Sequence, residues 1–191
     1  MKRIKSTLQQ AAVEAYEFKS SSLQLEELTT LSIARLHSLR PQSELPPETG
    51  ECSSNDPAML CLRPGEWLSI SEKLQSPELA TALRKMVVAG YAAVDDNTHG
   101  LAVFRLQGKG APWLLNKLSG LDYLAGKSTG THCAQTRMGH ITVLVYYHFI
   151  DQGAGVFDLI VDRSYARYFW ELLTASSAHA DDLALAHGDT A

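Results

Sequence analysis

Hydrophobic and polar positions are most regularly patterned between residues 101 and 173, where the spacing predicts strands and helices in close succession. Short apolar or alternating runs predict strands, and these are residues 101–106, 133–138, 141–150 and 156–161. Only Gly139-His140 separates the second strand from the third, so we expect these two to form a hairpin.

Two helices are predicted among these strands. Residues 111–118 carry apolar side chains at i, i+3, i+4 and i+7, which is the spacing of one helix face. A second helix is predicted to begin with Ser164 as its N-cap. Its expected apolar face consists of Tyr165, Phe169, Leu172 and Leu173.

The strand over residues 141–150 is apolar on both faces. Alternate positions place Val143 and Val145 on one face and Leu144 and Tyr146 on the other. A strand of this kind must be covered on both sides. We expect the helices of this chain on one side, and either more helices or another subunit on the other.

The N-terminal half mixes hairpin signals with one helix. Strands are predicted over residues 31–39, over 59–70 with a break at Arg63-Pro64-Gly65, and over 91–94, whereas 42–57 reads as a loop. We expect a helix with Ser76 as its N-cap, Pro77 at its first position and a stop at Gly90. Hairpins combined with crossovers predict an α+β fold, a mostly antiparallel sheet with packed helices.

The two ends of the chain differ from this central region. Residues 4–19 have a narrow, Ala-rich apolar stripe, so 1–22 is interpreted as an N-terminal helical arm that docks on this chain or is ordered by a partner. Residues 23–175 form the expected α+β domain. Residues 176–191 have little to bury and are interpreted as a flexible tail.

Composition excludes several classes of function. Of 191 residues, 45% are hydrophobic and 20% charged, and the formal net charge is −4 with scattered Lys and Arg, which argues against nucleic acid binding. No apolar run approaches the ~20 residues of a membrane helix. The basic N-terminus lacks the apolar core of a signal peptide, and three widely spaced cysteines suit a reducing compartment. We therefore expect a cytoplasmic protein.

Gly108-Lys109-Gly110 lies between a predicted strand and a predicted helix, where phosphate-binding turns occur. The dinucleotide-binding fingerprint fails, because Trp113 occupies the position of the third glycine and Pro112 precedes it. The segment is interpreted as a tight strand-to-helix turn.

Four residues have the chemistry of metal ligands: His132, Cys133, His140 and His148. A hairpin about Gly139-His140 pairs Met138 with Ile141, Cys133 with Tyr146, and His132 with Tyr147. His132 and Cys133 then point to opposite faces, so no three of the four converge and no metal site is expected.

The remaining candidates also favour structural roles. Asp95, Asp96 and Asp122 lie where turns are expected, and Cys133 has no evident base on its own face. No nucleophile, base and orienting group can be assembled, so neither catalytic nor cofactor-binding residues are predicted. Exposed aromatic and second-face positions instead predict a subunit interface, with the candidates Trp113, Tyr146, His148 and Ile150.

A series of short motifs resembles the gamma subunits of heterotetrameric sarcosine oxidases. In order they are Leu62-Arg63-Pro64-Gly65-Glu66-Trp67-Leu68, Leu106-Gln107-Gly108, Leu114-Leu115, Leu121-Asp122, Cys133-Ala134-Gln135-Thr136, Val161-Asp162-Arg163-Ser164-Tyr165-Ala166 and Trp170-Glu171-Leu172-Leu173. Their order and spacing fit over about residues 60–173. Lys109 departs from the family, in which Gly-Pro is usual there, and segment 124–130 also differs.

The resemblance implies a fold similar to part of the folate-binding aminomethyltransferase, or glycine-cleavage T-protein, fold. It also implies alpha, beta and delta partner subunits that hold FAD, FMN, NAD, tetrahydrofolate and zinc. Such complexes oxidise sarcosine to glycine, form hydrogen peroxide and pass the one-carbon unit to tetrahydrofolate. Related complexes demethylate other N-methyl amino acids.

The expected function is therefore that of a non-catalytic assembly subunit of this oxidoreductase, which binds no cofactor itself. Two alternatives remain open. One is a stand-alone folate-binding, aminomethyltransferase-like protein, although the chain is about half the length that this fold needs. The other is a homo-oligomeric scaffold.

Overall fold

The computed structural model describes residues 17–20, 22–40, 42, 44–87, 90–123, 131–151 and 154–188. Most of the predicted N-terminal arm therefore lies outside the described residues. The last residues of the predicted helix 4–19 are not helical, because Glu17–Lys19 form strand β1. A hydrogen bond from Ser20 N to Leu23 O (2.9 Å) closes a tight turn, after which residues 24–26 pair with β1. The backbone groups of β1 therefore bond to a neighbouring strand and not within a helix.

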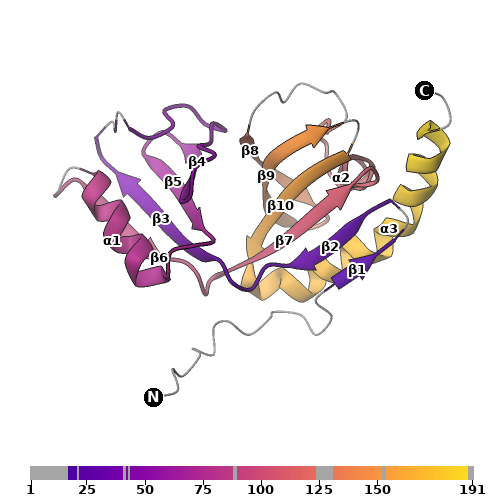
Figure 1. Ribbon diagram of the computed structural model, residues 1–191, viewed down its shortest axis with the longest axis horizontal. Helices are drawn as coiled ribbons and strands as arrows, with labels where there is room; N and C mark the ends of the chain where they lie inside the picture. Colours follow the sequence, from indigo (N-terminus) through magenta and orange to yellow (C-terminus); the bar gives the residue numbers. More distant parts are fainter. Residues whose placement is uncertain are drawn as a thin grey trace, which may run out of the picture.

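The larger of two antiparallel sheets has six strands in the order β1-β2-β7-β10-β9-β8. These are β1 (Glu17–Lys19), β2 (Gln24–Glu27), β7 (Leu101–Gly108), β8 (His132–Met138), β9 (Ile141–Asp151) and β10 (Ala154–Asp162). Helices α2 (Ala111–Leu118) and α3 (Ala166–Gly188), the latter preceded by a 3₁₀ turn at Arg163–Tyr165, pack against one face of this sheet (Figure 1).

The smaller sheet has four antiparallel strands in the order β4-β5-β3-β6. They are β3 (Ser32–Ser38), β4 (Ala58–Arg63), β5 (Glu66–Ser71) and β6 (Ala92–Asp96), and helix α1 (Ser76–Met86) lies against the outer face. All of these elements lie in the sequence between β2 and β7, which are neighbours in the larger sheet.

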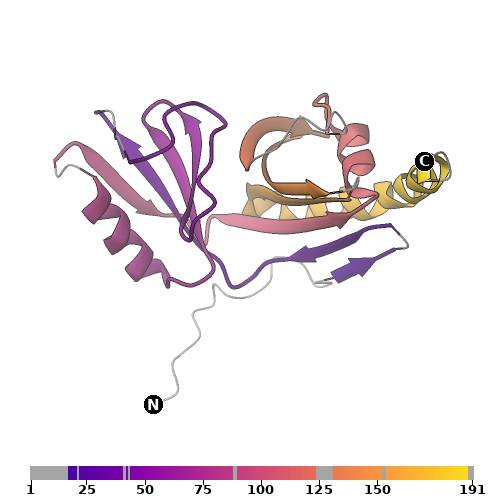
Figure 2. The same ribbon diagram turned by 45° about the horizontal axis from the view of Figure 1, so that its top comes forward.

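The two sheets face each other, and the helices lie outside them (Figure 2). Leu144 and Tyr146 of β9 are 7% and 4% exposed and pack against the smaller sheet in a cluster that includes Ile33 and Leu68. The α+β class is therefore confirmed. The expectation that this second face of β9 needs more helices or another subunit is wrong, because residues 31–71, whose pairing with each other cannot be read from periodicity, supply a covering sheet.

The predicted hairpin is confirmed in its register. Met138 pairs with Ile141, Cys133 with Tyr146, and His132 with Tyr147. The predicted helix over residues 111–118 is also confirmed. Gly139 has φ +58°, which allows the two-residue turn.

Both predicted N-caps are displaced from their expected positions. The helix cap of α1 is Gln75, which forms a reciprocal capping box with Glu78 and leaves Pro77 in the first turn. At the last helix, Asp162 accepts a bond from Ser164 N at 2.8 Å, so Asp162 rather than Ser164 caps the 3₁₀ turn. Tyr165 is 50% exposed and does not belong to the buried face.

Residues 176–188, which were interpreted as part of a tail, are helical, because α3 continues to Gly188. Its sequence is rich in Ala, which has the highest helix propensity, and Ser176 and Ser177 are buried against the core. The small, weakly hydrophobic residues that suggested a lack of pattern are therefore compatible with a long helix. None of the described helices is long and apolar enough to cross a lipid bilayer.

Candidate functional site

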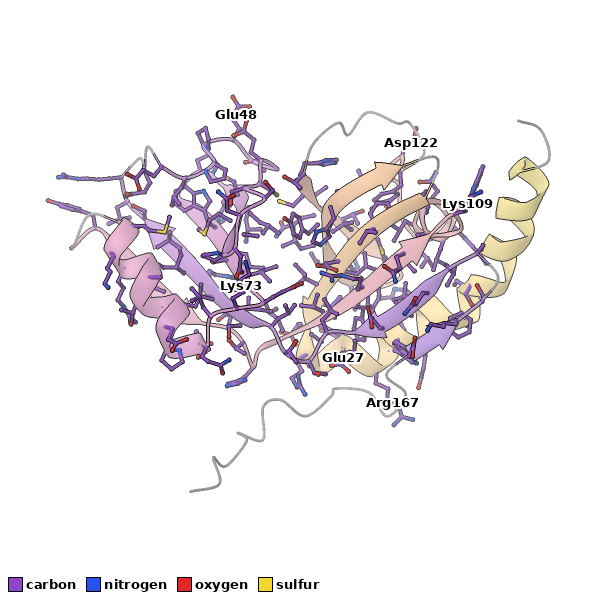
Figure 3. The ribbon with its side chains drawn as sticks, viewed as in Figure 1. Glu27, Glu48, Lys73, Lys109, Asp122 and Arg167 are labelled. Atoms are coloured by element: carbon purple, nitrogen blue, oxygen red, sulfur yellow. The ribbon has the colours of Figure 1, made fainter. Side chains whose placement is uncertain are left out.

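The Gly108-Lys109-Gly110 turn is closed by the chain itself. Gly108 has φ +118°, and a Cβ there would lie 2.3 Å from the backbone oxygen of Ser22. Gly110 N also donates to that oxygen at 2.9 Å, while the Lys109 side chain is exposed (Figure 3). The glycines thus permit close packing of the segment before β2, and the interpretation as a tight structural turn is confirmed.

The structure separates the predicted metal-ligand candidates. The imidazole of His132 stacks on Tyr147 with ring centroids 3.8 Å apart, whereas Cys133 belongs to the core between the sheets, so these two side chains lie on opposite faces of β8, as predicted. His140 is exposed in the hairpin turn. Within the part of the chain that the structure describes, no three His, Cys, Asp or Glu side chains are arranged to hold a metal ion.

The acids at the end of β6 differ in their surroundings. Asp96 accepts hydrogen bonds from the Ser76 hydroxyl and from Thr98 N. Burial alone would raise the pKa of Asp96, but these bonds hold it below its usual value. Asp96 therefore ties the start of α1 to the β6–β7 turn, in agreement with the predicted structural role. Asp95 and Asp122 are exposed.

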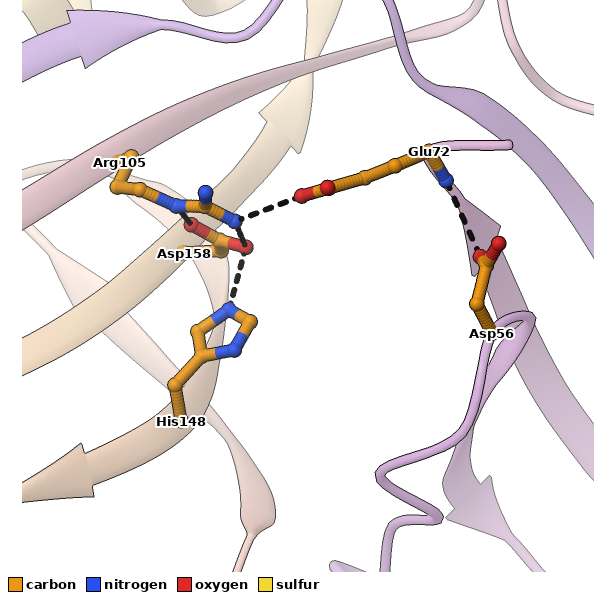
Figure 4. A network of polar contacts seen from close by, with 5 residues as sticks. All are labelled: Asp56, Glu72, Arg105, His148 and Asp158. Carbon is orange, nitrogen blue, oxygen red and sulfur yellow. Dashed lines mark hydrogen bonds and ion pairs between the residues drawn. The ribbon is translucent and has the colours of Figure 1, made fainter.

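A polar cluster lies between the two sheets and was not predicted (Figure 4). Asp158, which is 2% exposed, accepts bonds from Arg105 Nε and Nη2 at 2.8 and 2.9 Å. His148 Nε2 lies 2.6 Å from the second carboxylate oxygen of Asp158. Arg105 Nη2 also approaches Glu72, which directly follows β5 of the smaller sheet, at 3.3 Å, and Glu72 N donates to Asp56 at 3.2 Å.

The charges in this cluster stabilise each other. Burial alone would raise the pKa of Asp158, but the hydrogen bonds from His148 and Arg105 lower it, so the carboxylate stays ionised. The bond to Asp158 in turn raises the pKa of Arg105 despite burial. The cluster ties β7, β9 and β10 together, and the contact of Arg105 with Glu72 extends it to the segment after β5. We call this cluster the clamp, and its geometry favours a structural role over proton transfer.

A surface hollow of about 790 Å³ lies beside the first residues of β8. Its lining includes Glu44, Glu51, Cys52, His132 and Cys133. A short extended segment lines part of the hollow. In this segment Glu51 forms an isolated antiparallel β-bridge with His132, and Cys52 forms one with Leu60. This segment therefore lies between an edge strand of each sheet.

The four candidate interface residues have different environments. Trp113 is half-buried against the helix-covered core, and His148 belongs to the clamp with Asp158. Tyr146 is buried by the smaller sheet, and burial raises its pKa to about 12. The reason for placing Tyr146 at a subunit interface is thereby removed, because this chain already covers it. The Ile150 side chain lies outside the described residues.

Sequence reasoning missed the clamp and the proximity of Cys52 and Cys133, which line the same hollow. The available signal was a single charged residue inside each of two apolar strands, Arg105 in β7 and Asp158 in β10. A charge at such a position requires a partner, since an unpaired buried charge is strongly unfavourable. The identity of the partner depends on which strands are neighbours, and periodicity does not give that information.

No protein-family model and no curated protein matches the sequence. Solved structures do match. A chain of the heterotetrameric sarcosine oxidase from Corynebacterium sp. U-96, in complex with pyrrole 2-carboxylate, aligns with TM-score 0.71 and 19% identity over 86% of this chain and 88% of that chain.

The glycine cleavage system aminomethyltransferase T from Bartonella henselae aligns with TM-score 0.57 and 12% identity over 80% of this chain. The alignment covers 45% of the transferase chain, so the present chain corresponds to less than half of that enzyme. The chain therefore has the fold of a sarcosine oxidase chain, which is also found in part of an aminomethyltransferase T.

Proposed function

We propose that this chain is a non-catalytic structural subunit of a heterotetrameric sarcosine oxidase-type flavoenzyme. The main support is the alignment with the Corynebacterium oxidase chain, which spans 86% of one chain and 88% of the other. The two chains therefore correspond along nearly their whole length, as expected of equivalent subunits. The sequence motifs that resemble gamma subunits point to the same role.

In this proposal the chemistry belongs to partner subunits. The alpha, beta and delta subunits would hold FAD, FMN, NAD, tetrahydrofolate and zinc. The complex would demethylate sarcosine, or a related N-methyl amino acid, and deliver the one-carbon unit to tetrahydrofolate. The present chain contributes surface and rigidity, which agrees with the clamp between its sheets and with the structural use of Asp96 and Asp158.

An aromatic surface formed by Tyr165 and Tyr168 is suited to contact a partner. Tyr165, the last residue of the 3₁₀ turn, is 50% exposed, and Tyr168, in the first turn of α3, is 38% exposed. Tyr168 also lies beside the hairpin turn, because a Cβ on Gly139 would meet its hydroxyl at 2.5 Å. Exposed tyrosines on a rigid element are common anchors of protein interfaces.

The test is purification of the full chain, affinity-tagged in its native source, followed by absorbance spectroscopy and an assay of sarcosine-dependent peroxide formation. We expect a stable complex with a flavin spectrum and activity, and neither property in the chain expressed alone. Recovery of the native chain without a flavoprotein would contradict the proposal.

The same preparations address the alternative of a folate-binding protein. Titration of the isolated chain with tetrahydrofolate is expected to give no saturable binding. Tight saturable binding would favour the aminomethyltransferase-like alternative, and a defined homo-oligomer without foreign subunits would favour the scaffold alternative.

A further inference from the structure

The three cysteines of the protein are far apart in sequence, but their backbones lie close together at the edge where the two sheets join. The segment containing Gly50 and Glu51 is held on both sides. Cys61 N donates to Glu51 O at 2.9 Å, and Cys133 N donates to Gly50 O at 2.8 Å. Cys52 directly follows this segment, so β4 and β8 place the three residues around one short piece of backbone.

Two of the three thiols occupy the same region of the molecule. The Cys52 and Cys133 side chains both belong to the core between the sheets. Cys52 Sγ donates to Gly50 O at 3.6 Å, and Cys133 Sγ donates to Cys61 O at 3.7 Å. Cys61 instead belongs to the core beneath α1, on the other side of the smaller sheet, and its Sγ lies 3.6 Å from Arg63 O. The geometry therefore selects one pair and excludes the third cysteine.

The paired thiols also line the hollow beside β8. Cys52 is half-buried and Cys133 is 4% exposed, whereas Cys61 has no exposed surface. A small oxidant can thus reach the pair through the hollow without opening of the core.

We propose that Cys52 and Cys133 are a redox-active pair that forms a reversible disulfide on reaction with a peroxide. The inference is independent of the function proposed above, since it uses only the geometry of this chain. The disulfide would covalently link the segment at residues 50–52, which pairs with β4 of the smaller sheet, to β8 of the larger sheet.

The reaction proceeds in two steps. The Cys133 thiolate attacks one oxygen of hydrogen peroxide, the O–O bond breaks, and Cys133 sulfenic acid and hydroxide form. The Cys52 sulfur then attacks the Cys133 sulfur, the S–O bond breaks, and water leaves with the proton of the Cys52 thiol. The two cysteines lose two electrons in total, and the peroxide gains them.

The environment assigns different roles to the two sulfurs. The nearby Cys52 lowers the pKa of Cys133 despite burial, which favours Cys133 as the thiolate that reacts first. The nearby Cys133, together with burial, raises the pKa of Cys52, which makes Cys52 the resolving thiol. Burial also raises the pKa of Cys61, so that thiol should react slowly.

The test is peptide mapping of the full folded chain after treatment with hydrogen peroxide and alkylation under denaturing, non-reducing conditions. We expect a Cys52–Cys133 linked peptide, an alkylated Cys61, and complete reversal by dithiothreitol. Cys61→Ser is the matched control and should leave the linked peptide unchanged. The oxidised protein should also melt at a higher temperature than the reduced protein.

Cys52→Ser separates the two steps. Without the resolving thiol, Cys133 should accumulate as sulfenic acid that a dimedone probe labels at least tenfold faster than Cys61. A disulfide that includes Cys61, or a Cys52 and Cys133 that both stay reduced at peroxide doses that oxidise glutathione, would overturn the inference. The wild-type map alone decides between these outcomes if a variant fails to fold.

Discussion

Arg105 on β7 and Asp158 on β10 lie directly opposite each other in neighbouring antiparallel strands. Their side chains form a bidentate ion pair on the face of the larger sheet that is directed toward the smaller sheet. Glu72, which directly follows β5 of that sheet, approaches the same guanidinium. One strand pair of the larger sheet is thus connected electrostatically to the segment that follows β5 of the smaller sheet.

Replacing Asp158 with Asn is expected to destabilise the folded chain by about 2–3 kcal/mol. Breaking a fully buried pair costs about 3–5 kcal/mol, but the Arg105 side chain is 22% exposed and keeps Glu72 as a partner. Urea unfolding at neutral pH measures this loss. Asp95→Asn is the control, since Asp95 is exposed, and its effect should stay within about 0.5 kcal/mol.

Acid should weaken the wild-type clamp. Because the folded-state pKa of Asp158 is lowered, its carboxylate contributes stability that is complete above the ordinary Asp pKa of about 4 and is lost as pH falls through the folded-state value. Unfolding free energies measured between pH 7 and 3 should therefore fall more steeply for wild type than for Asp158→Asn. Parallel curves would contradict this account.

Two glycines allow backbone strain to be separated from steric overlap. Gly90 and Gly108 both have positive φ, but a Cβ at Gly90 meets nothing within 4 Å, whereas one at Gly108 lies 2.3 Å from Ser22 O. Gly90→Ala should cost about 1–2 kcal/mol, and Gly108→Ala about 3 kcal/mol or more because backbone must move. Equal losses in chemical denaturation would show that the packing against Ser22 is not tight.

The burial of the second face of β9 can be measured on the isolated chain. Leu144→Ala should cost about 2–3 kcal/mol, because the side chain packs against the smaller sheet. Thr142→Ala, on the same face of the same strand but exposed, should change the free energy of unfolding by less than about 0.5 kcal/mol. A small effect of Leu144→Ala would restore the earlier expectation that another subunit covers this face.

The aromatic surface formed by Tyr165 and Tyr168 gives a prediction for assembly. The double substitution Tyr165→Ser and Tyr168→Ser should weaken binding to the proposed partner subunits at least tenfold, equivalent to about 1.4 kcal/mol. Size-exclusion chromatography and titration of the purified partners measure this. Leu121→Ser, at an exposed apolar residue elsewhere, should leave assembly unchanged. Unaltered assembly of the double variant would place the interface on another surface.

The elements of the C-terminal half could be predicted because their contacts are local. The hairpin register about Gly139-His140 follows from alternation and a two-residue turn, and helix α2 follows from its 3.6-residue period. Neither signal depends on which distant strands become neighbours.

The clamp and the cysteine pair could not be predicted, since they depend on long-range neighbours. Asp158 meets Arg105 only because β10 pairs with β7, and Cys52 meets Cys133 only because a loop bridges the two sheets. The helical structure of residues 176–188 was not predicted for a different reason. Alanine buries little surface but favours helix strongly, so weak hydrophobic patterning does not imply lack of structure.

The position of the smaller sheet in the chain has a consequence for folding and for engineering. Leu28 N donates to Val103 O at 2.8 Å, and Asn97 N donates to Ile33 O at 2.8 Å, so the chain leaves the larger sheet and re-enters it at nearly the same point. Pairing of β2 with β7 therefore has to close a loop of residues 29–100, and closure of so long a loop should slow folding. A tight turn that joined Leu28 to Val103 would preserve that strand pair but expose Leu144 and Tyr146 to solvent, so residues 29–100 serve as the cover of one apolar face of the larger sheet.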